Sequence, residues 1–410
     1  MMEEISLIII LISLVILIYS FLVTIKNNNY PKKPTSQGKN CILIPARNES
    51  KVIEDLLISI ENQTQKIDSK DVYVIVETPK DKTVDIVKKH KMNIVYRKDL
   101  TKKRKGYALD DAIKEILREN KHYSAYFIFD ADNILDKNYI KEMQKSINEG
   151  YDIGISYRNT KNSKTLVAAS SALTFSMINT IGNTFKNKYS NNLTISGTGY
   201  YIKGTLLEEL EGFPFNTLTE DYELTLYSTL NNITTTYNEK AIFYDEQPDS
   251  FKVSIVQRTR WVKGYFEARK KYIKKIRKSI NKGAIEIGGV DIKDINYGSK
   301  INAIIGVKPY IYLIVGVILL LISSVQSGLI GLLNVALIIS FTIYIDLVLI
   351  SYLIIKREDY KLNLEISKIK LILYNPIFLL SYIICLINAI VKKDVSWQVV
   401  EHTKTLTNEE

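Results

Sequence analysis

The uneven distribution of apolar residues constrains this 410-residue chain more than any other feature of its sequence. The run from Ile5 to Ile25 is almost wholly aliphatic and uncharged, and the longer run from Pro309 to Ile345 is also uncharged. An α-helix rises about 1.5 Å per residue, so roughly 20 apolar residues cross a hydrocarbon core about 30 Å thick. We therefore expect membrane-spanning helices on both sides of a more polar central region.

The charges around the first apolar run predict its orientation. Lys26, Lys32 and Lys33 follow the run directly, and lysines beside a span usually remain in the cytoplasm. A cleaved signal peptide fits less well, because Glu3 and Glu4 stand where lysines are usual and no A-x-A cleavage site follows. We expect a multi-pass protein of the cell membrane with a cytoplasmic domain after the first span.

With the C-terminal apolar runs we count four membrane segments, and the nature of the last one is open. Pro309–Ile345 is long enough for two helices with a turn at Gln326–Gly328. Leu371–Val391 is also uncharged, but Asn375-Pro376 interrupts it, so both a full span and a re-entrant segment fit. An even total of spans would place the C-terminal tail outside, whereas the basic pair Lys392-Lys393 favours the cytoplasm.

Between these runs, residues from Asn40 to about Ser250 alternate strand-like and helix-like patterns. Strands that alternate with helices predict an α/β fold with a mainly parallel sheet. Ligands of such sheets bind beyond the carboxyl ends of the strands, so polar residues there are candidate site residues. The expected strands are Cys41–Pro45, Val72–Val76, Asn93–Tyr96 and Ala125–Phe129, and the expected helices are Val52–Ile60, Val84–Lys89 and Tyr107–Leu117.

The segment from Phe251 to Lys282 has a different composition. It is rich in lysine and arginine, with Trp261, Tyr265, Phe266 and Tyr272 among them, which is typical of a helix in the membrane interface. The net charge of +11 also fits nucleic-acid binding. The apolar runs on both sides favour membrane lipids, so we expect no nucleic-acid partner.

The cysteines and histidines exclude several classes of site. The two cysteines, Cys41 and Cys385, form no CxxC pattern, and the three histidines are scattered. A zinc site, a disulfide scaffold and a histidine-centred triad are therefore not expected.

Two acidic motifs are the first candidates for chemistry. Asp130-Ala131-Asp132 follows an apolar strand, where two carboxylates can hold a hard divalent cation together with a substrate diphosphate. A solvated turn is the alternative. Glu220-Asp221 opens a helical pattern, where an acidic pair either caps the helix or includes a general base that deprotonates an acceptor hydroxyl.

A third motif lies in the basic segment. Gln257, Arg260 and Trp261 are three and four residues apart, so on a helix they share one face. Arginine can stabilise a departing diphosphate, and an indole can stack against a sugar or a base. Anchoring in the membrane interface is the alternative, and it explains the arginine and the tryptophan but not the glutamine.

In this order, Asp-x-Asp, Thr-Glu-Asp and Gln-x-x-Arg-Trp between membrane runs resemble family 2 glycosyltransferases of the GT-A fold. The similarity covers roughly Asn40 to Lys270 and is greatest to the processive branch, the cellulose, chitin, hyaluronan and poly-N-acetylglucosamine synthases. It implies an inverting hexosyl or N-acetylhexosaminyl transferase that uses a nucleotide-sugar, first of all a UDP-sugar, and forms a β-linked polysaccharide at the cytoplasmic membrane face. Transfer of one sugar to a lipid acceptor is the alternative, and a non-catalytic membrane-anchored scaffold is a third hypothesis.

The resemblance also implies a division of the chain. It places an N-terminal anchor at 1–30, the GT-A catalytic domain at 38–250, interfacial amphipathic helices at 251–300, a transmembrane region at 301–395 and a tail at 396–410.

Individual site residues follow from the same resemblance. The second strand of the family normally ends in an aspartate that reads the base, and Glu77 stands at that point here, so either Glu77 or Asp81 takes this role. The residues assigned to the donor are Pro45, Arg47, Glu49, Glu77, Asp81, Lys105, Asp130 and Asp132. Those assigned to the acceptor and the diphosphate are Gly197, Gly199, Gln257, Arg260 and Trp261.

The implied mechanism is a single in-line displacement. Mg²⁺ or Mn²⁺ on Asp132, helped by Asp130, neutralises the diphosphate, and Asp221, beside Glu220, removes the acceptor proton. Family donors are α-linked, so one displacement gives a β-linked product. The partners implied are the sugar donor, a glycan or lipid acceptor and membrane lipids. Whether one chain forms a polymer channel, or needs an accessory export subunit or a second copy, is left open by the sequence.

Overall fold

The computed structural model describes residues 38–184, 187, 193–281, 318, 322, 328–362 and 364–392. The chain divides into two compact units. The first comprises residues 30–187, 191–272 and 354–410, and the second comprises residues 1–29, 188–190 and 273–353. The predicted span Ile5–Ile25, residues 282–317 and the tail 396–410 lie outside the described residues.

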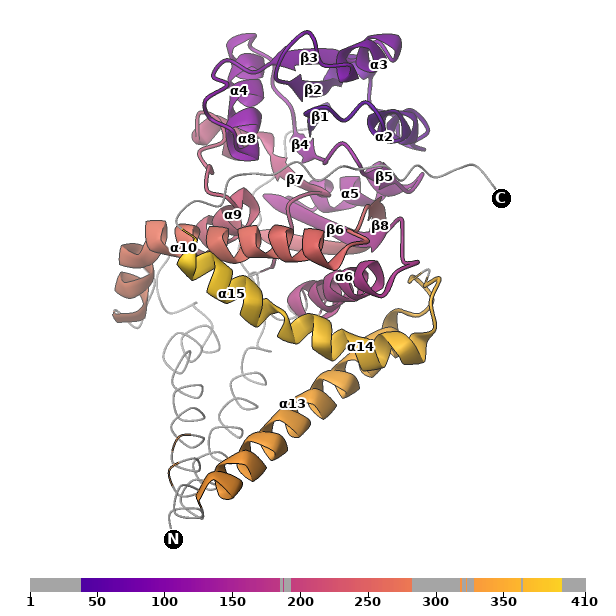
Figure 1. The fold of residues 1–410 in the computed structure, drawn as a ribbon. Helices are drawn as coiled ribbons and strands as arrows, with labels where there is room; N and C mark the ends of the chain where they lie inside the picture. Colours follow the sequence, from indigo (N-terminus) through magenta and orange to yellow (C-terminus); the bar gives the residue numbers. More distant parts are fainter. Residues whose placement is uncertain are drawn as a thin grey trace. The chain divides into compact units, whose positions relative to one another are not determined.

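An eight-stranded sheet lies in the first unit (Figure 1). Its strand order is β3-β2-β1-β4-β7-β6-β8-β5. Parallel pairing joins β1 to β2 and β4, β2 to β3, and β6 to β8, whereas β7 is antiparallel to β4 and β6, and β5 is antiparallel to β8. The strands are β1 Asn40–Pro45, β2 Val72–Val76, β3 Asn93–Tyr96, β4 Ala125–Ile128, β5 Ile134–Leu135, β6 Ile153–Thr160, β7 Tyr200–Lys203 and β8 Thr235–Asp245.

The sheet is therefore mixed, and the expectation of a mainly parallel sheet is wrong for the half beyond β4. The four strands expected from the sequence form the parallel block β3-β2-β1-β4, and their ends differ from the prediction by at most one residue. Beyond this block, β7 runs in the opposite direction and pairs Tyr200 with Ile128. The apolar pattern of a buried strand does not encode its direction, which depends on the strands beside it.

Side chains of each central strand alternate between two apolar cores, one on each face of the sheet. Cys41 and Leu43 of β1 belong to one core, and Ile42 and Ile44 belong to the other. All four are fully buried, which explains why β1 reads as a continuous apolar run rather than an alternating one.

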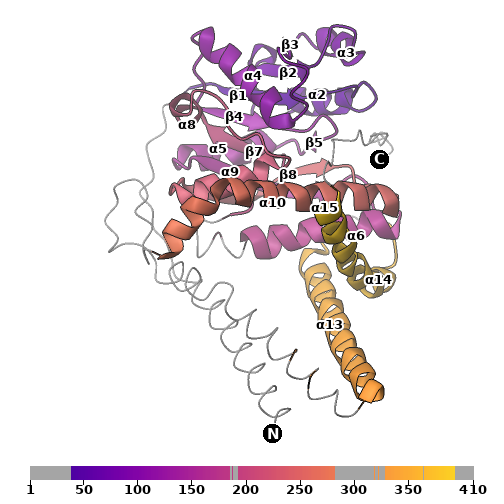
Figure 2. The same ribbon diagram turned by 60° about the vertical axis from the view of Figure 1, so that its left-hand side comes forward.

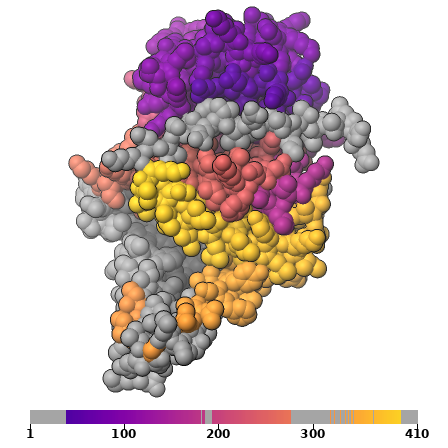
Figure 3. Space-filling model, in the orientation of Figure 1, coloured from indigo at the N-terminus to yellow at the C-terminus, as the bar shows by residue number. Residues whose placement is uncertain are grey.

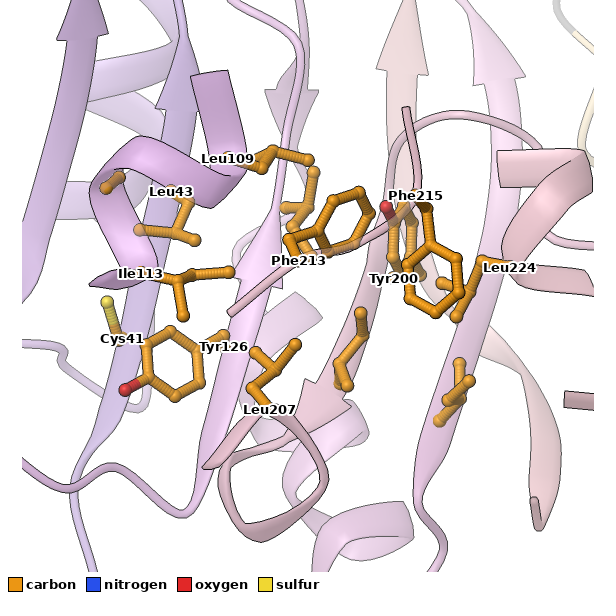
Figure 4. Packing of buried hydrophobic residues seen from close by; sticks show 14 of the residues in the cluster. Cys41, Leu43, Leu109, Ile113, Tyr126, Tyr200, Leu207, Phe213, Phe215 and Leu224 are labelled. Atoms are coloured by element: carbon orange, nitrogen blue, oxygen red, sulfur yellow. The ribbon is translucent and has the colours of Figure 1, made fainter. Parts of the chain in front are cut away.

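Helix α4 (Lys105–Arg118) covers the first of these cores. Its buried residues include Leu109, Ala112, Ile113 and Ile116, whose spacing of three and four places them on one face. Figure 4 shows Leu109 and Ile113 in this core together with aromatic side chains such as Phe213 and Tyr126. The other helices around the sheet are α2 Ile53–Glu61, α3 Thr83–Lys89, α5 Tyr139–Asn148, α6 Leu166–Met177, α8 Gly204–Glu209 and α9 Glu220–Leu230.

The C-terminal part of the first unit packs against helix α6. A third apolar cluster joins Ala169 and Leu173 of α6 to Leu371, which lies in α14 (Lys368–Leu380). The last turn of α13 (Gly328–Glu358) adds Ile354 and Ile355 to the same cluster. Helix α10 (Phe251–Asn281) lies beside α6 in both views, and α15 (Tyr382–Val391) continues from α14 (Figures 1 and 2).

The predicted membrane spans are described only in part. Among the described residues, one helical segment, Lys368–Val391, is long and apolar enough to cross a membrane. It contains the predicted run Leu371–Val391, and it includes the end of α14 and the start of α15 at Ser381. A well-buried helix of a water-soluble protein can meet the same criteria, so the multi-pass arrangement stays a prediction.

We expect Ile113→Ala to lower the free energy of unfolding by about 2–5 kcal/mol, because it leaves a cavity in the core beneath α4. Lys114→Ala on the exposed side of the same helix is the matched control, with an expected change within about 0.5 kcal/mol. Denaturant unfolding of both variants in the same detergent measures the difference. Equal stabilities would show that this face of α4 does not pack as described.

Candidate active site

The Asp130-Ala131-Asp132 motif follows β4 directly and is bonded to a second loop. The Thr198 hydroxyl accepts a hydrogen bond from the backbone N–H of Asp130 at 2.9 Å and donates to the side-chain oxygen of Asn133. The N–H of Gly199 donates to the carbonyl of Ile128 at 2.9 Å. The acidic motif and the 197–199 loop are therefore one connected structure.

Glycine is required at position 199 of this loop. Gly199 has φ +68°, and a Cβ atom there would lie 2.1 Å from the Phe243 ring. Both the left-handed backbone and the close approach exclude a larger side chain. Gly197, with φ +82°, lies next to the acidic pair, since a Cβ atom there would be 3.4 Å from Oδ2 of Asp221.

Lys105, the first residue of α4, connects three segments of the site. Its ammonium donates hydrogen bonds to Oδ1 of Asp130 and to the carbonyl oxygen of Gly197, the latter at 2.7 Å. It also lies 3.8 Å from Oε1 of Glu220. Burial opposes its charge, but the carboxylates of Asp130 and Glu220 outweigh this effect and raise the pKa of Lys105.

Glu220 and Asp221 form the first turn of α9. Burial, with a smaller contribution from Asp221, raises the pKa of Glu220 to about 7 although Lys105 opposes the shift. Burial also raises the pKa of Asp221, while a hydrogen bond from the Tyr222 N–H, Lys105 and Arg158 lower it. An acidic pair of this kind is suited to proton transfer near neutral pH.

A different acid bonds the loop that leads into α9. Oε2 of Glu223 accepts hydrogen bonds from the backbone N–H groups of Asn216 and Thr217, at 3.0 and 2.9 Å. Glu223 is fully buried and pairs with Lys271 of α10. Glu223 thus bonds the loop before α9, while Asp221 accepts a bond from the Tyr222 N–H within the first turn, so the acidic pair also bonds the start of the helix.

Helix α10 brings Arg260 to the same carboxylates. Burial lowers the pKa of Arg260, and the negative charges of Glu220, Asp130 and Asp221 oppose this shift. The approach depends on Gly264, because a Cβ atom there would lie 2.5 Å from the side chain of Thr219.

The other two members of this motif take different positions. Trp261 packs edge-to-face against Phe175 of α6, with the ring centroids 5.8 Å apart. Gln257 is half-buried on α10. The structure therefore brings Arg260 to the acidic residues and places Trp261 against α6.

Two further residues of the site were missed in the sequence. Arg158 on β6 donates to Oδ2 of Asp245, at the end of β8, from its Nε at 2.7 Å and from a terminal nitrogen. Another terminal nitrogen donates to the carbonyl of Ser196 at 2.8 Å. Burial raises the pKa of Asp245 to about 6, although Arg158 lowers it. The sequence did offer one signal for this pair, because Arg158 lies within an apolar strand pattern and a buried cation needs an anionic partner.

Arg158 also connects this ion pair to helix α10. Its guanidinium carbon lies 3.6 Å from the centroid of the Phe175 ring. Because Phe175 also contacts Trp261 edge-to-face, Arg158, Phe175 and Trp261 form a continuous row of contacts, called the stack below, from the sheet to α10.

The residues expected to read the base are placed differently. Arg47 pairs with Glu77 at 3.0 Å, beyond the ends of β1 and β2. The two oxygens of Asp81 instead accept backbone hydrogen bonds from Asn48 and Thr83, at 2.8 and 2.9 Å. Asp81 thus fixes the loop after β1 to the start of α3.

Pro45 and Glu49, which were also assigned to the donor, lie at the end of β1 and in the loop that follows it. Pro45 ends β1 and is paired with Ile75. The backbone N–H of Glu49 donates to the Thr83 hydroxyl at 3.1 Å. Asn48 and Glu49 of this loop therefore bond Asp81 and Thr83, respectively, at the start of α3.

Asp130 and Asp132 are the residues that could hold a divalent metal ion. Oδ2 of Asp132 accepts a hydrogen bond from the Glu246 N–H at 3.1 Å. Within the described ranges, no three His, Cys, Asp or Glu side chains are grouped as a complete metal site. Two carboxylates nevertheless fit a hard cation whose other ligands come from a diphosphate or water.

The balance of charge supports this fit. The carboxylates that interact here are those of Asp130, Asp132, Glu220, Asp221 and Asp245, and the cations among them are Lys105, Arg158 and Arg260. The acidic side chains outnumber the basic ones, so a bound divalent cation would offset the excess negative charge.

Comparisons with known proteins give one family match. The sequence profile of the family described as "Glycosyltransferase like family 2" matches residues 40–264. The probable glycosyltransferase YdaM of Bacillus subtilis (strain 168) is 26% identical over 231 residues, which are 55% of this chain and 55% of that protein. This chain therefore spans about half the length of the curated relative it matches.

One solved structure shares the fold of this chain. The mannosyltransferase PcManGT from Pyrobaculum calidifontis, in complex with GDP-Man and Mn²⁺, has a TM-score of 0.56 at 15% identity, over 96% of this chain and 100% of that chain. S. aureus TarS 1–349 has a TM-score of 0.41 at 16% identity, over 58% of this chain and 65% of that chain. At 15% identity, the similarity to PcManGT shows a shared fold and nothing further.

The raised pKa of Glu220 predicts how the free energy of unfolding depends on pH. Its pKa is about 7 in the folded protein against an ordinary 4.5, so the folded state binds the proton more tightly. The free energy of unfolding should therefore fall as pH rises from about 4.5 to 7. Glu220→Gln removes this titration, while Asp245, whose pKa is about 6, still contributes in the same direction.

Unfolding across this pH range with a chelator present measures the effect of Glu220. We expect Glu220→Gln to flatten the profile relative to the exposed control Glu119→Gln. Identical profiles for the two variants would contradict a raised pKa at Glu220.

The Arg158–Asp245 pair gives a second prediction. The two side chains are only 14% and 3% exposed, so Arg158→Met leaves a buried carboxylate without its partner and should cost about 3–5 kcal/mol. Adding Asp245→Asn removes that charge and should recover part of the loss. A double-mutant cycle measured by denaturant unfolding, with Lys164→Met as a surface control, separates coupling from simple loss of packing.

Proposed function

Because this chain belongs to glycosyltransferase family 2, we propose that it is an inverting transferase that moves a sugar from a nucleotide-sugar, first of all a UDP-sugar, to a glycan acceptor, forming a β-linked polysaccharide. The observation that carries this proposal is the joint placement of Lys105, Asp130 and Glu220 beyond the end of β4. Three segments far apart in the sequence meet there with the charges that phosphate chemistry and proton transfer need.

The leaving diphosphate would lie beside Asp130 and Asp132. These two carboxylates would hold a Mg²⁺ or Mn²⁺ ion, which supplies positive charge where the diphosphate gains negative charge. Arg260 supplies a second positive group from α10, and its guanidinium can bind phosphate oxygens in a bidentate manner. The PcManGT complex, which shares the fold, contains GDP-Man and Mn²⁺, so a GDP-sugar is the first alternative donor.

We assign the general base to Asp221. Glu220 is buried and has a pKa of about 7, and Asp221 beside it is partly exposed and has a raised pKa. A proton on Glu220 leaves Asp221 ionised, and its raised pKa makes it a stronger base than an exposed aspartate. The nearby 197–199 loop would then hold the acceptor hydroxyl close to Asp221, since Gly197 presents no side chain there.

For the base of the donor, the contacts favour Glu77 over Asp81. Both oxygens of Asp81 accept backbone hydrogen bonds, so base recognition by Asp81 would compete with the loop that it holds. Glu77 pairs with Arg47, and both side chains are partly exposed. The pair can therefore rearrange when a nucleotide binds.

We further propose that transfer takes place at the cytoplasmic face of the cell membrane. The apolar runs of the sequence and the basic helix α10 support this location. The same proposal includes domain boundaries at residues 30, 250, 300 and 395. It also includes a glycan or lipid acceptor, and either an accessory export subunit or a second copy of the chain as a partner.

We expect Asp221→Asn to reduce transfer by about 10²–10⁴-fold, because it removes the proton acceptor, with little change in donor binding. Purified full-length protein is tested with a panel of UDP-sugars and GDP-mannose, with Mg²⁺, Mn²⁺ or a chelator. The exposed variant Glu119→Gln serves as the matched control and should retain full activity.

The products and the Asp221→Asn result test different parts of the proposal. A polymer ladder supports the polysaccharide synthase, whereas a product with one sugar on a lipid would replace it by the alternative. Undiminished transfer by Asp221→Asn would show that another group is the base.

A further inference from the structure

Helices α14 and α15 have two faces of different kinds. Each helix has an exposed apolar face, in which side chains are 50–71% exposed and recur three or four residues apart, and the two faces together are called the stripe. The other face is buried against the rest of the first unit. The stripe comprises Ile369, Leu373, Ile377, Ile383, Ile387 and Ile390. Figure 3 shows α14 and α15, in yellow, at the surface.

The opposite face is fixed along its whole length. Leu371, near the start of α14, packs against α6. Cys385 in α15 contacts the carbonyl of Ile255 at 3.8 Å, and Lys263 donates to the carbonyl of Ala389 at 3.0 Å. Helix α14 therefore packs along α6, and α15 contacts α10 at Ile255 and Lys263, so neither helix points away from the rest of the unit.

A buried arginine lies at the middle of this segment. Arg258 of α10 is 1% exposed and donates to the carbonyl of Phe378 at 3.0 Å. Its guanidinium carbon is 4.0 Å from the centroid of the Phe378 ring and 4.8 Å from that of Tyr382. These two residues flank Ser381, where α14 ends and α15 begins.

This arginine argues against a crossing orientation. If 368–391 crossed the bilayer, its midpoint would lie in the hydrocarbon core and would hold Arg258 there. A charged side chain at the bilayer centre costs at least about 2.5–3.5 kcal/mol. The other cationic residues of α10 would also be drawn toward the hydrocarbon core, because Arg258 belongs to the same helix. With 13 and 10 residues, the two helices are each about 15–20 Å long at 1.5 Å per residue, shorter than a core of about 30 Å.

The charges around the stripe fit an anionic lipid surface. Lys370 stands at its start and Lys392 at its end, and residues 368–392 contain no Asp or Glu, while Lys368 pairs with Asp359. Lysines at both ends of an apolar stripe can reach lipid phosphates while the stripe enters the acyl boundary. Helix α10 adds exposed lysines, among them Lys252 and Lys270.

We propose that α14 and α15 lie in the plane of the membrane, with the exposed stripe inserted among the lipids of one anionic leaflet, and that 368–391 is not a span. The proposal rests on the membrane location proposed above but not on the transfer reaction. It keeps the segment after Val391 on the same side as the catalytic residues, as the basic pair Lys392-Lys393 favours.

Depth measurements on nitroxide labels test this orientation. Single cysteines replace Ile369, Ile377, Ile383 and Ile390 in the full chain, with Cys41 and Cys385 changed to alanine, and Lys51→Cys on the exposed surface reports water. The protein is reconstituted in vesicles of phosphatidylcholine and phosphatidylglycerol, and collision rates with oxygen and with a nickel chelate are compared. An in-plane segment should give four similar, shallow depths, within about one helical turn of 5.4 Å.

Each other result overturns the proposal in a distinct way. Shallow ends with the two middle labels about 10 Å deeper would show a span. Low collision rates with both reagents would show that protein covers the stripe, either another apolar segment of this chain or a second copy. Rates equal to those at Lys51→Cys would place the stripe in water and would also contradict the proposed membrane location, whereas a span would leave that location intact.

Discussion

The ammonium group of Lys105 holds together the three segments on which the site depends. It bonds Asp130 after β4 and the carbonyl of Gly197, and it lies near Glu220 at the start of α9. Without this cation, the carboxylates of Asp130 and Asp221 would repel that of the buried Glu220, where both repulsion and desolvation are costly. Burial nevertheless raises the pKa of Glu220 to about 7 despite Lys105, and an acid with a pKa near neutrality is suited to proton transfer.

Two more cations complete this arrangement from different elements. Arg158 holds the end of β8 through Asp245, and Arg260 reaches the acidic residues from α10. The stack of Arg158, Phe175 and Trp261 links the sheet to α10 through α6. The tryptophan of the Gln-x-x-Arg-Trp motif thus has a packing role in this structure, which positions the helix that carries Arg260.

The C-terminal helices show how packing changes the meaning of an apolar run. Hydropathy treats 368–391 as one segment long enough to span a membrane. The structure divides it at Ser381 and buries one face along α6 and α10, with Arg258 at the middle. An apolar run that is amphipathic only in its tertiary context cannot be distinguished from a span by composition, because the face that it buries is apolar too.

The sequence by itself determined the first half of the sheet and most of the charged residues of the site. Continuous apolar runs such as Cys41–Pro45 are buried on both faces, so local composition is sufficient to find them. Asp130, Glu220 and Arg260 were found because each belongs to a short motif of fixed spacing. Arg158 and Asp245 were missed because they are 87 residues apart, and only the parallel pairing of β6 with β8 makes them partners.

Tertiary structure alone decided the direction of β7, the different contacts of Glu77 and Asp81, and the face on which α14 and α15 pack. Each of these depends on contacts between residues far apart in the chain, such as Asp81 with Asn48 or Arg258 with Phe378. Local sequence patterns indicate whether a residue tends to be buried and in which kind of element. They do not report which distant residue will contact it, since that is fixed only when the whole chain packs.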